Sequence, residues 1–299
     1  MNLKMKKYLL SLLLILLVGG NLLAQEEATY GTFKDTRVIN AHSVETLPKR
    51  KLDIRIGHRF GDMFGTSGGW PSFYGLENSV DVLIGAEYGV TDAFTIGLYR
   101  AKGAGDRKQL VNGLLKYGLI KQKSGGAPIS VTPLFVTSAS TMVRQENAQG
   151  VASFPKFIHR FAFSGQVLIA RKFSDRFSLQ LNPAYTHRNL VSDGDQNGVF
   201  SVGLASRVQI TKVFGLILEV EVPLNGPQSP FTDLVPPGEE PYQPILGIGF
   251  EFDTGGHVFQ VNLTNSEGMV ATDYLVNTRS NWLDGEFRLG FTISRLFNL

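Results

Sequence analysis

The chain has 299 residues, a formal net charge of +3 and no cysteine, which leaves no thiol for a disulfide, a thiolate metal site or a lipoprotein anchor. Glycine (33 residues) and phenylalanine (21 residues) are abundant, yet the mean hydropathy is only +0.01, far below that of a helical membrane protein. Strands that alternate polar and apolar residues average to such a value, so the composition is compatible with a membrane β-barrel.

The first 24 residues have the pattern of a secretory signal peptide. Three lysines within residues 4–7 precede an uncharged apolar run over residues 8–18, which is too short to span a bilayer. We expect cleavage after Ala24. Those three lysines account for the whole net charge, so the mature chain gives no reason to expect binding of nucleic acid. Since no second long apolar run follows, we expect no transmembrane helix.

Residues 25–50 form a polar, mixed segment without strand-like alternation. Two placements are open: a periplasmic tail packed at the rim of the barrel base, or a plug folded into the lumen. We favour the first placement, a tail or rim segment packed near the barrel base. A short, weak helical pattern lies at residues 43–47.

From residue 51 onward the chain alternates polar and apolar residues with a period of two, which predicts strands. The sequence predicts an all-β fold: an antiparallel transmembrane β-barrel of about twelve strands over residues 51–299. The predicted strands are 51–60, 79–90, 93–102, 107–121, 128–139, 159–172, 176–187, 198–210, 213–223, 244–252, 256–265 and 285–298.

The predicted connections alternate in length. Five are short and turn-like, near residues 91–92, 123–126, 174–175, 211–212 and 254–255, whereas most of the others are long. Outer-membrane barrels have short periplasmic turns and long extracellular loops. We therefore expect a cell outer-membrane location with both termini in the periplasm.

The two faces of the predicted strands differ in chemistry. One face is apolar, as contact with lipid requires, and we expect outer-membrane lipid and lipopolysaccharide to surround it. The other face carries charges of both signs, and the residues predicted to face the lumen are Asp53, Arg55, Arg59, Asp81, Glu87, Lys116, Arg207, Glu219, Glu221, Glu251, Glu286 and Arg288.

Mixed lumen charges allow two interpretations. A narrow channel for small solutes is one, although a pore selective for one ion sign usually lines its constriction with a single sign. Ion pairs that brace the wall and close the bore are the other. Pro133 and Pro183 fall inside predicted strands, where each removes a backbone donor, so we expect a bulge or a shortened strand there.

The last strand has one apolar face and ends the chain two residues after an aromatic. It resembles the C-terminal assembly signal of Gram-negative outer-membrane barrels, which implies recognition by the barrel assembly machinery. The residues of its apolar face are Phe287, Leu289, Phe291, Ile293, Phe297 and Leu299.

Two short motifs suggest other chemistry. Residues 65–69 match G-x-S-x-G around Ser67, but no helical pattern follows, as a hydrolase elbow requires, and a glycine-rich loop is favoured. Asp193, Asp195 and Asn197 match the first half of a calcium loop, but the twelfth position is Leu204. They remain a weak Ca²⁺ candidate. The five histidines have no metal-ligand spacing, so we expect no cofactor and no other metal.

The segments at residues 32–45 and 52–61, above all His58-Arg59-Phe60-Gly61, resemble a family of uncharacterised, exported β-barrel proteins of Bacteroidota-type Gram-negative bacteria, a domain of unknown function. The resemblance covers nearly all of the mature chain. It implies a barrel and no assigned activity.

The sequence thus predicts an outer-membrane barrel that is not an enzyme and acts as a narrow passive channel or a transport-associated barrel for small solutes. The alternative is an occluded structural or adaptor barrel that binds a periplasmic or surface partner. A weaker alternative is a surface lipid hydrolase using Ser67 or Ser206 with His187, although the latter two lie toward opposite ends of their strands.

Overall fold

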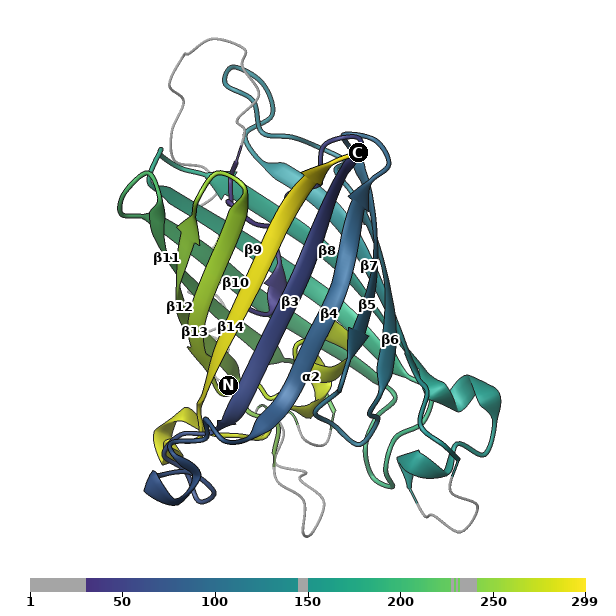
Figure 1. Cartoon of the computed structure of the whole chain (residues 1–299). Coiled ribbons are helices and arrows are strands. Elements are labelled where there is room, and N and C mark those ends of the chain that lie inside the picture. The colour runs from purple at the N-terminus through teal and green to yellow at the C-terminus, as the bar shows by residue number, and fades with distance from the viewer. Residues whose placement is uncertain (1–30, 145–149, 227–228, 230, 232–240) are drawn as a thin grey trace.

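Twelve antiparallel strands form one sheet that closes on itself as a barrel in the computed structural model (Figure 1). The structure describes residues 31–144, 150–226, 229, 231 and 241–299; the predicted signal peptide lies outside them. Each strand pairs with its neighbours in sequence, and the last strand pairs with the first. The strands are β3 (Lys51–Asp62), β4 (Ser79–Gly89), β5 (Phe94–Ala101), β6 (Leu110–Tyr117), β7 (Ser130–Ser140), β8 (Phe161–Lys172), β9 (Phe177–Arg188), β10 (Gly198–Gln209), β11 (Phe214–Pro223), β12 (Ile245–Asp253), β13 (His257–Thr264) and β14 (Arg288–Asn298).

The predicted fold class is confirmed, and each predicted strand overlaps an observed one. One local prediction is wrong, and one short helix has no counterpart in the prediction. Residues 43–47 contain no helix, because they run extended along the lumen wall and give their backbone hydrogen bonds to wall side chains. A helix, α2 (Ala271–Asn277), lies instead in the connection between β13 and β14. Seven residues make barely two turns, too few for a visible helical period.

Closure of the barrel depends on the pairing of β14 with β3, which runs from Lys51 opposite Asn298 to Asp62 opposite Arg288. The register shifts once, between Arg288 and Gly290. A second shift lies nearby, between β3 and β4 at Arg59 and Phe60. Such bulges bend a strand locally, and both lie toward the same end of the barrel.

The expected irregularity is present at Pro133, whereas Pro183 causes neither a bulge nor a shortened strand. The pairing of β6 with β7 stops at Lys116 and Leu134, directly before Pro133, and resumes as a single bridge between Ile120 and Val131 with the register moved by one residue. At Pro183 the register of β8 and β9 is kept, but the pairs between Gln166–Ala184 and Ile169–Leu181 are missing.

The two ends of the barrel differ in the length of their connections. At one end four of the five have three or four residues and the fifth, residues 118–129, has twelve; at the other end they have eight to 23 residues. The short ones, at the upper end in Figure 1, span residues 90–93, 118–129, 173–176, 210–213 and 254–256, and the C-terminus lies at the same end. The long connections lie at the lower end and span residues 63–78, 102–109, 141–160, 189–197, 224–244 and 265–287. We call these the short-turn end and the long-loop end.

The side chains are arranged inside out compared with a water-soluble barrel. Large apolar side chains point outward and are exposed, among them Ile84 (52%), Leu98 (65%) and Phe200 (56%). Polar and charged side chains point inward and are buried. No helix among the described residues is long and apolar enough to cross a membrane. The exposed apolar face fits a hydrocarbon surround.

We predict that a charge in the middle of this face destabilises the barrel much more than one at its edge. Leu98→Arg, at mid-strand in β5, is expected to lower the free energy of unfolding in lipid vesicles by about 2–4 kcal/mol. Val90→Arg, directly after β4, is expected to cost about 1 kcal/mol or less. Urea titration followed by tryptophan fluorescence measures both. Equal costs at the two positions would contradict a lipid-facing band.

Candidate functional site in the barrel lumen

The predicted lumen residues are, with one exception, buried inside the barrel. Eleven of the twelve have at most 6% of their surface exposed: Asp53, Arg55, Arg59, Asp81, Glu87, Lys116, Arg207, Glu219, Glu221, Glu251 and Arg288. The exception is Glu286, which precedes β14 and is only half-buried. Its carboxylate accepts a hydrogen bond from the backbone N–H of Asn281 at 2.8 Å, in the loop.

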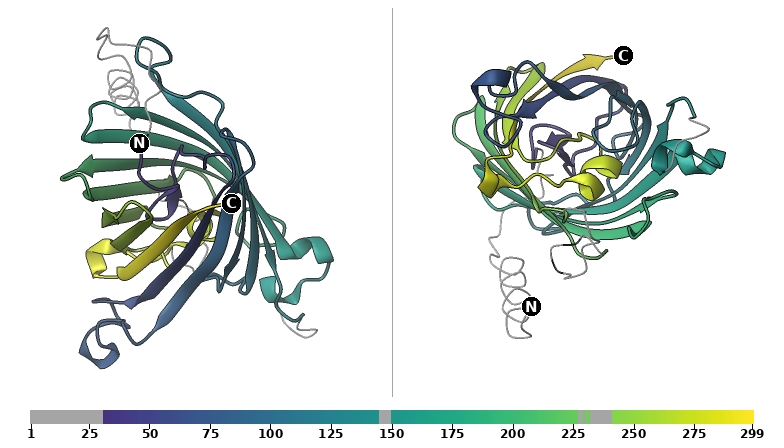
Figure 2. Two further views of the ribbon diagram at one scale, coloured as in Figure 1. Left: turned by 45° about the horizontal axis from the view of Figure 1, so that its top comes forward. Right: turned by 90° about the horizontal axis from the view of Figure 1, so that it is seen from below.

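The N-terminal segment fills much of the lumen. Residues 31–48, here called the N-terminal plug, fold as a small hairpin of β1 (Arg37–Val38) and β2 (Ala41–His42) inside the ring of strands, as the view from the long-loop end shows (Figure 2). The turn between them holds Ile39 at φ 61°. These residues therefore do not lie at the rim, which the sequence favoured. They fold into the lumen, which was the alternative.

The plug enters from the short-turn end. Arg50 donates its backbone N–H to the carbonyl of Gly89 at 2.8 Å, which fixes the chain where it passes from the plug into β3. The carbonyl oxygen of Pro48 lies so close to Gly89 that a Cβ there would be 2.1 Å away. Glycine at position 89 allows this close approach.

Glu219 on β11 holds the tip of the plug. Its carboxylate accepts hydrogen bonds from the backbone N–H groups of Asn40 and Ala41, each at 2.9 Å, and from the Asn40 side-chain amide at 2.5 Å. The opposite wall completes the contact, because Arg59 donates to the Asn40 side-chain oxygen at 2.7 Å and to Asn262 at 2.6 Å.

A second polar cluster holds the stem of the plug. Arg55 on β3 pairs with Asp35 of the plug and with Asp53 of its own strand, at 3.0 Å for the latter. Lys116 on β6 donates to the carbonyl oxygens of Thr36 at 3.2 Å and Glu45 at 3.1 Å. The charged side chains that the sequence suggested as a pore lining thus form hydrogen bonds and ion pairs with the plug. These contacts replace the hydrogen bonds to water that the side chains lose on burial.

Burial changes the pKa values of two ionisable side chains of the plug, His42 and Glu45. Burial lowers the pKa of His42 well below its usual value, and the neighbouring Arg37, Lys116 and Arg55 lower it further, so the imidazole is neutral at pH 7. Burial raises the pKa of Glu45, whose carboxylate accepts the Phe33 backbone N–H at 3.1 Å.

A second insertion closes the lumen from the long-loop end. Residues 265–280, here called the α2 segment, fold back into the barrel with α2 buried (Figure 2). Asp81 on β4 accepts the Met269 backbone N–H at 3.0 Å, and Asp273 in α2 accepts the N–H groups of Ala104 and Gly105 at 2.8 and 3.1 Å. Arg37 of the plug donates to the Met269 carbonyl at 3.0 Å and joins the two insertions.

The remaining lumen charges are paired within the wall or the loops. Arg207 on β10 forms an ion pair with Glu251 on β12. Glu87 accepts a hydrogen bond from Tyr99 at 2.5 Å. Glu221 accepts one from Asn182 at 3.1 Å. Arg288 donates to the Asn265 carbonyl, to Ser280 and to Glu267.

The G-x-S-x-G segment forms no catalytic constellation in the structure. Ser67 lies in the loop after β3, and its hydroxyl donates to Asp62 at 3.3 Å. His187 faces outward on β9 and stacks on Tyr185. Ser206 pairs with Leu179, eight residues along β9 from His187, or about 26 Å at the rise of a strand.

The calcium candidate residues also do not converge. Asp195 accepts a hydrogen bond from Tyr242 at 2.9 Å and forms an ion pair with Arg188 at 2.9 Å. The Asn197 amide donates to the Arg188 carbonyl, and Asp193 is exposed. Among the residues that the structure describes, no group of three or more acidic, histidine or cysteine side chains is placed to hold a metal ion.

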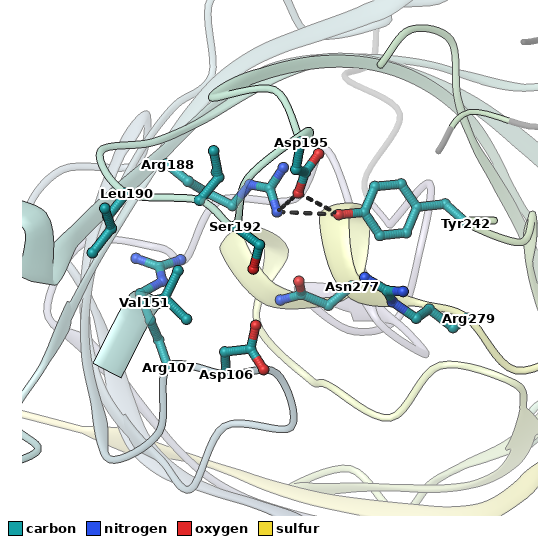
Figure 3. A pocket seen from close by; sticks show the side chains of 11 residues that line it. Asp106, Arg107, Val151, Arg188, Leu190, Ser192, Asp195, Tyr242, Asn277 and Arg279 are labelled. Carbon is teal, nitrogen blue, oxygen red and sulfur yellow. Dashed lines mark hydrogen bonds and ion pairs between the residues drawn. The ribbon is translucent and has the colours of Figure 1, made fainter. Parts of the chain in front are cut away.

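A small polar pocket lies at the long-loop end, between the α2 segment and four other long connections (Figure 3). No sequence pattern indicates this pocket, because all of its residues except Arg188, the last residue of β9, lie in connections without periodicity. It is lined by Asp106, Arg107, Val151, Arg188, Leu190, Val191, Ser192, Asp195, Tyr242, Asn277 and Arg279.

A closed antiparallel barrel with an apolar outer face and a polar, filled interior defines a membrane-bound β-barrel. Residues 33–297 match the family model described as "membrane bound beta barrel domain (DUF5777)", and the chain belongs to that family. The prediction of an uncharacterised barrel family is confirmed. No curated protein matches the chain in sequence.

Several solved barrels resemble the fold at low sequence identity. KdgM porin matches with 8% identity and a TM-score of 0.48, over 83% of this chain and 99% of its own. An outer membrane channel from Pseudomonas putida F1 matches with 14% identity and a TM-score of 0.44, over 85% and 98%. The Pseudomonas putida toluene transporter TodX matches with 7% identity and a TM-score of 0.41, over 93% and 100%.

We predict that Glu219 is the anchor of the plug and that Glu221, two residues further along the strand, is not. Glu219→Ala removes three hydrogen bonds to the plug and is expected to weaken its docking by about 2–4 kcal/mol. Glu221 contacts the wall residue Asn182, so Glu221→Ala is the matched control. Hydrogen exchange of residues 31–48 measures docking. Equal exchange in both variants would contradict the assignment.

Proposed function

We propose that the protein is an integral outer-membrane barrel that takes part in the transport of small solutes and is held closed by its N-terminal plug. The observation that carries this proposal is the filled lumen: two insertions, one from each end, occupy the bore and bury its charges. A permanently open channel does not fit this arrangement. Passage requires that the plug move.

The contacts of the plug suit a removable closure. The plug is bound by hydrogen bonds and ion pairs to Glu219, Arg55 and Lys116 of the wall. When the plug leaves, water can replace it as the hydrogen-bonding partner of these three side chains. The wall left behind is polar and compatible with a water-filled bore. The plug joins the barrel only at its C-terminal end, beside Gly89, so it can swing out toward the short-turn end.

The proposal includes the orientation and the assembly route. We place the short turns and both termini in the periplasm and the long loops outside the cell, after removal of residues 1–24. The terminal strand β14 is offered to the barrel assembly machinery, and lipid and lipopolysaccharide surround the wall. A periplasmic partner is compatible with a plug that faces that side. We propose no enzymatic activity, no cofactor and no nucleic acid partner.

A structural or adaptor barrel is the second candidate. It is favoured by ion pairs such as Arg207–Glu251, which join two strands of the wall to each other. In this case the bore stays closed and the exposed loops or the plug bind a partner. The lipid hydrolase has no such support, because Ser206 and His187 lie at different heights of the barrel.

The orientation is tested by labelling cysteines, for which the cysteine-free chain is a clean background. Leu283→Cys, 93% exposed at the long-loop end, is expected to react with a membrane-impermeant maleimide on intact cells. Asp175→Cys, exposed in a short turn, is expected to react only after the outer membrane is opened. The reverse pattern would invert the proposed topology.

The transport role is tested by locking the plug. The Ile39 Cδ1 atom lies 2.9 Å from the place that a Cβ on Gly247 would take, so these two positions are neighbours, and we test Ile39→Cys with Gly247→Cys as an oxidisable pair. In planar bilayers, with Glu219→Ala added to loosen the plug, the oxidised protein is expected to be silent. The reduced protein is expected to show discrete conductance steps.

The single-cysteine variants are the controls and are expected to behave alike with and without reductant. Folding is checked by the shift in gel mobility on heating. A folded, reduced protein that never conducts would contradict the transport role and favour the structural barrel. Conductance that is unchanged by oxidation would contradict the plug as its gate.

A further inference from the structure

The pocket at the long-loop end is lined by a buried arginine, Arg107, one of whose nitrogens has no hydrogen-bond partner. Arg107 comes from the connection between β5 and β6, and 7% of its surface is exposed. Its side chain makes one hydrogen bond, from Nη2 to the Thr272 carbonyl at 3.4 Å, while Nη1 is buried with no partner. Within the part of the chain that the structure describes, no carboxylate oxygen lies within 4 Å of this guanidinium.

Arg188, which also lines the pocket, differs from Arg107 in that both of its terminal nitrogens have partners, although its Nε has none. Arg188 donates to Tyr242 at 3.2 Å and to the Gln196 carbonyl at 2.7 Å, and it forms an ion pair with Asp195. The Tyr242 hydroxyl donates in turn to Asp195. These three side chains form a closed wall on one side of the pocket (Figure 3).

The carboxylates of Asp273 and Asp106 favour the charged form of Arg107, but among the described residues neither forms an ion pair with it. Asp273 gives its oxygens to the backbone N–H groups of Ala104 and Gly105 and to the amide of Asn277. Asp106 is exposed to solvent. Burial lowers the pKa of Arg107 to about 10, and the charge of Arg188 also lowers it, so Arg107 remains charged at pH 7 although it is buried.

From this geometry we infer that the pocket is a binding site for a small, singly charged carboxylate, with Arg107 as its anion-binding residue. A guanidinium binds a carboxylate through two parallel hydrogen bonds, and Arg107 has a donor free for it. The enclosed space of the pocket is about 30 Å³, which limits a ligand to a few heavy atoms.

The lining selects against more highly charged anions. Three arginines and two aspartates line the pocket, so the formal charge of the lining is 3 − 2 = +1. A monocarboxylate balances this charge, whereas a dianion such as inorganic phosphate exceeds it. Ser192 and Asn277 supply polar groups beside the charge. The inference rests on the proposed function in that it names the class of solute gathered at the long-loop entrance.

Binding is measured at equilibrium, without transport, so that failure of this inference is distinguishable from failure of the transport role. The full chain, folded in detergent, is titrated with ¹³C-labelled acetate and followed by NMR line broadening. Saturable binding is expected at low salt. Arg107→Gln is expected to weaken it about ten-fold or more, while Arg176→Gln, an exposed arginine in a short turn, leaves it unchanged.

A second variant guards against misfolding of Arg107→Gln. Asp106→Asn removes an exposed charge that makes no hydrogen bond in the structure and is expected to tighten acetate binding by about two- to five-fold. Acetate binding that is absent, or that neither variant changes, would overturn the inference. Phosphate binding tighter than acetate at pH 7 would overturn the selection for single charge.

Discussion

The structure depends on the requirement that every backbone N–H and C=O within a membrane find a partner inside the protein. An open sheet leaves two edges, and in hydrocarbon each unsatisfied group costs several kcal/mol. The pairing of β14 with β3, from Lys51 to Asp62, removes both edges at once. Closure then fixes the faces, because alternate side chains of each strand must point to lipid and to the lumen.

Closure also creates the problem that the two insertions solve. A ring of twelve strands encloses more space than its own side chains fill. The inward charges, including Arg55, Lys116 and Glu219, therefore require either water or protein partners. In this barrel the partners come from the N-terminal plug and the α2 segment, largely through backbone groups such as the N–H of Ala41 and the carbonyl of Thr36. Polar plug and polar wall satisfy each other.

The same logic separates the two ends. At the short-turn end the chain passes from the plug into β3 beside Gly89, and the turns leave little room for a site. At the long-loop end five connections converge above α2, and there the protein keeps Arg107 buried without a carboxylate partner. A buried cation with a free donor is costly unless a ligand supplies the missing acceptor. The proposed movable plug and the proposed binding pocket thus lie at opposite ends of the barrel.

The sequence by itself determined the strands, their order and the face of each residue, because a period of two is a local property that lipid exposure enforces on every strand. It also singled out Glu219 and Arg55 as lumen residues. It did not determine where residues 31–48 lie, and it placed Glu286 on a strand that begins only at Arg288. The plug, the α2 segment and the Arg107 pocket were decided by the tertiary structure alone. Their contacts join residues far apart in sequence, such as Asn40 and Glu219, and no local pattern records which distant side chain completes a hydrogen bond.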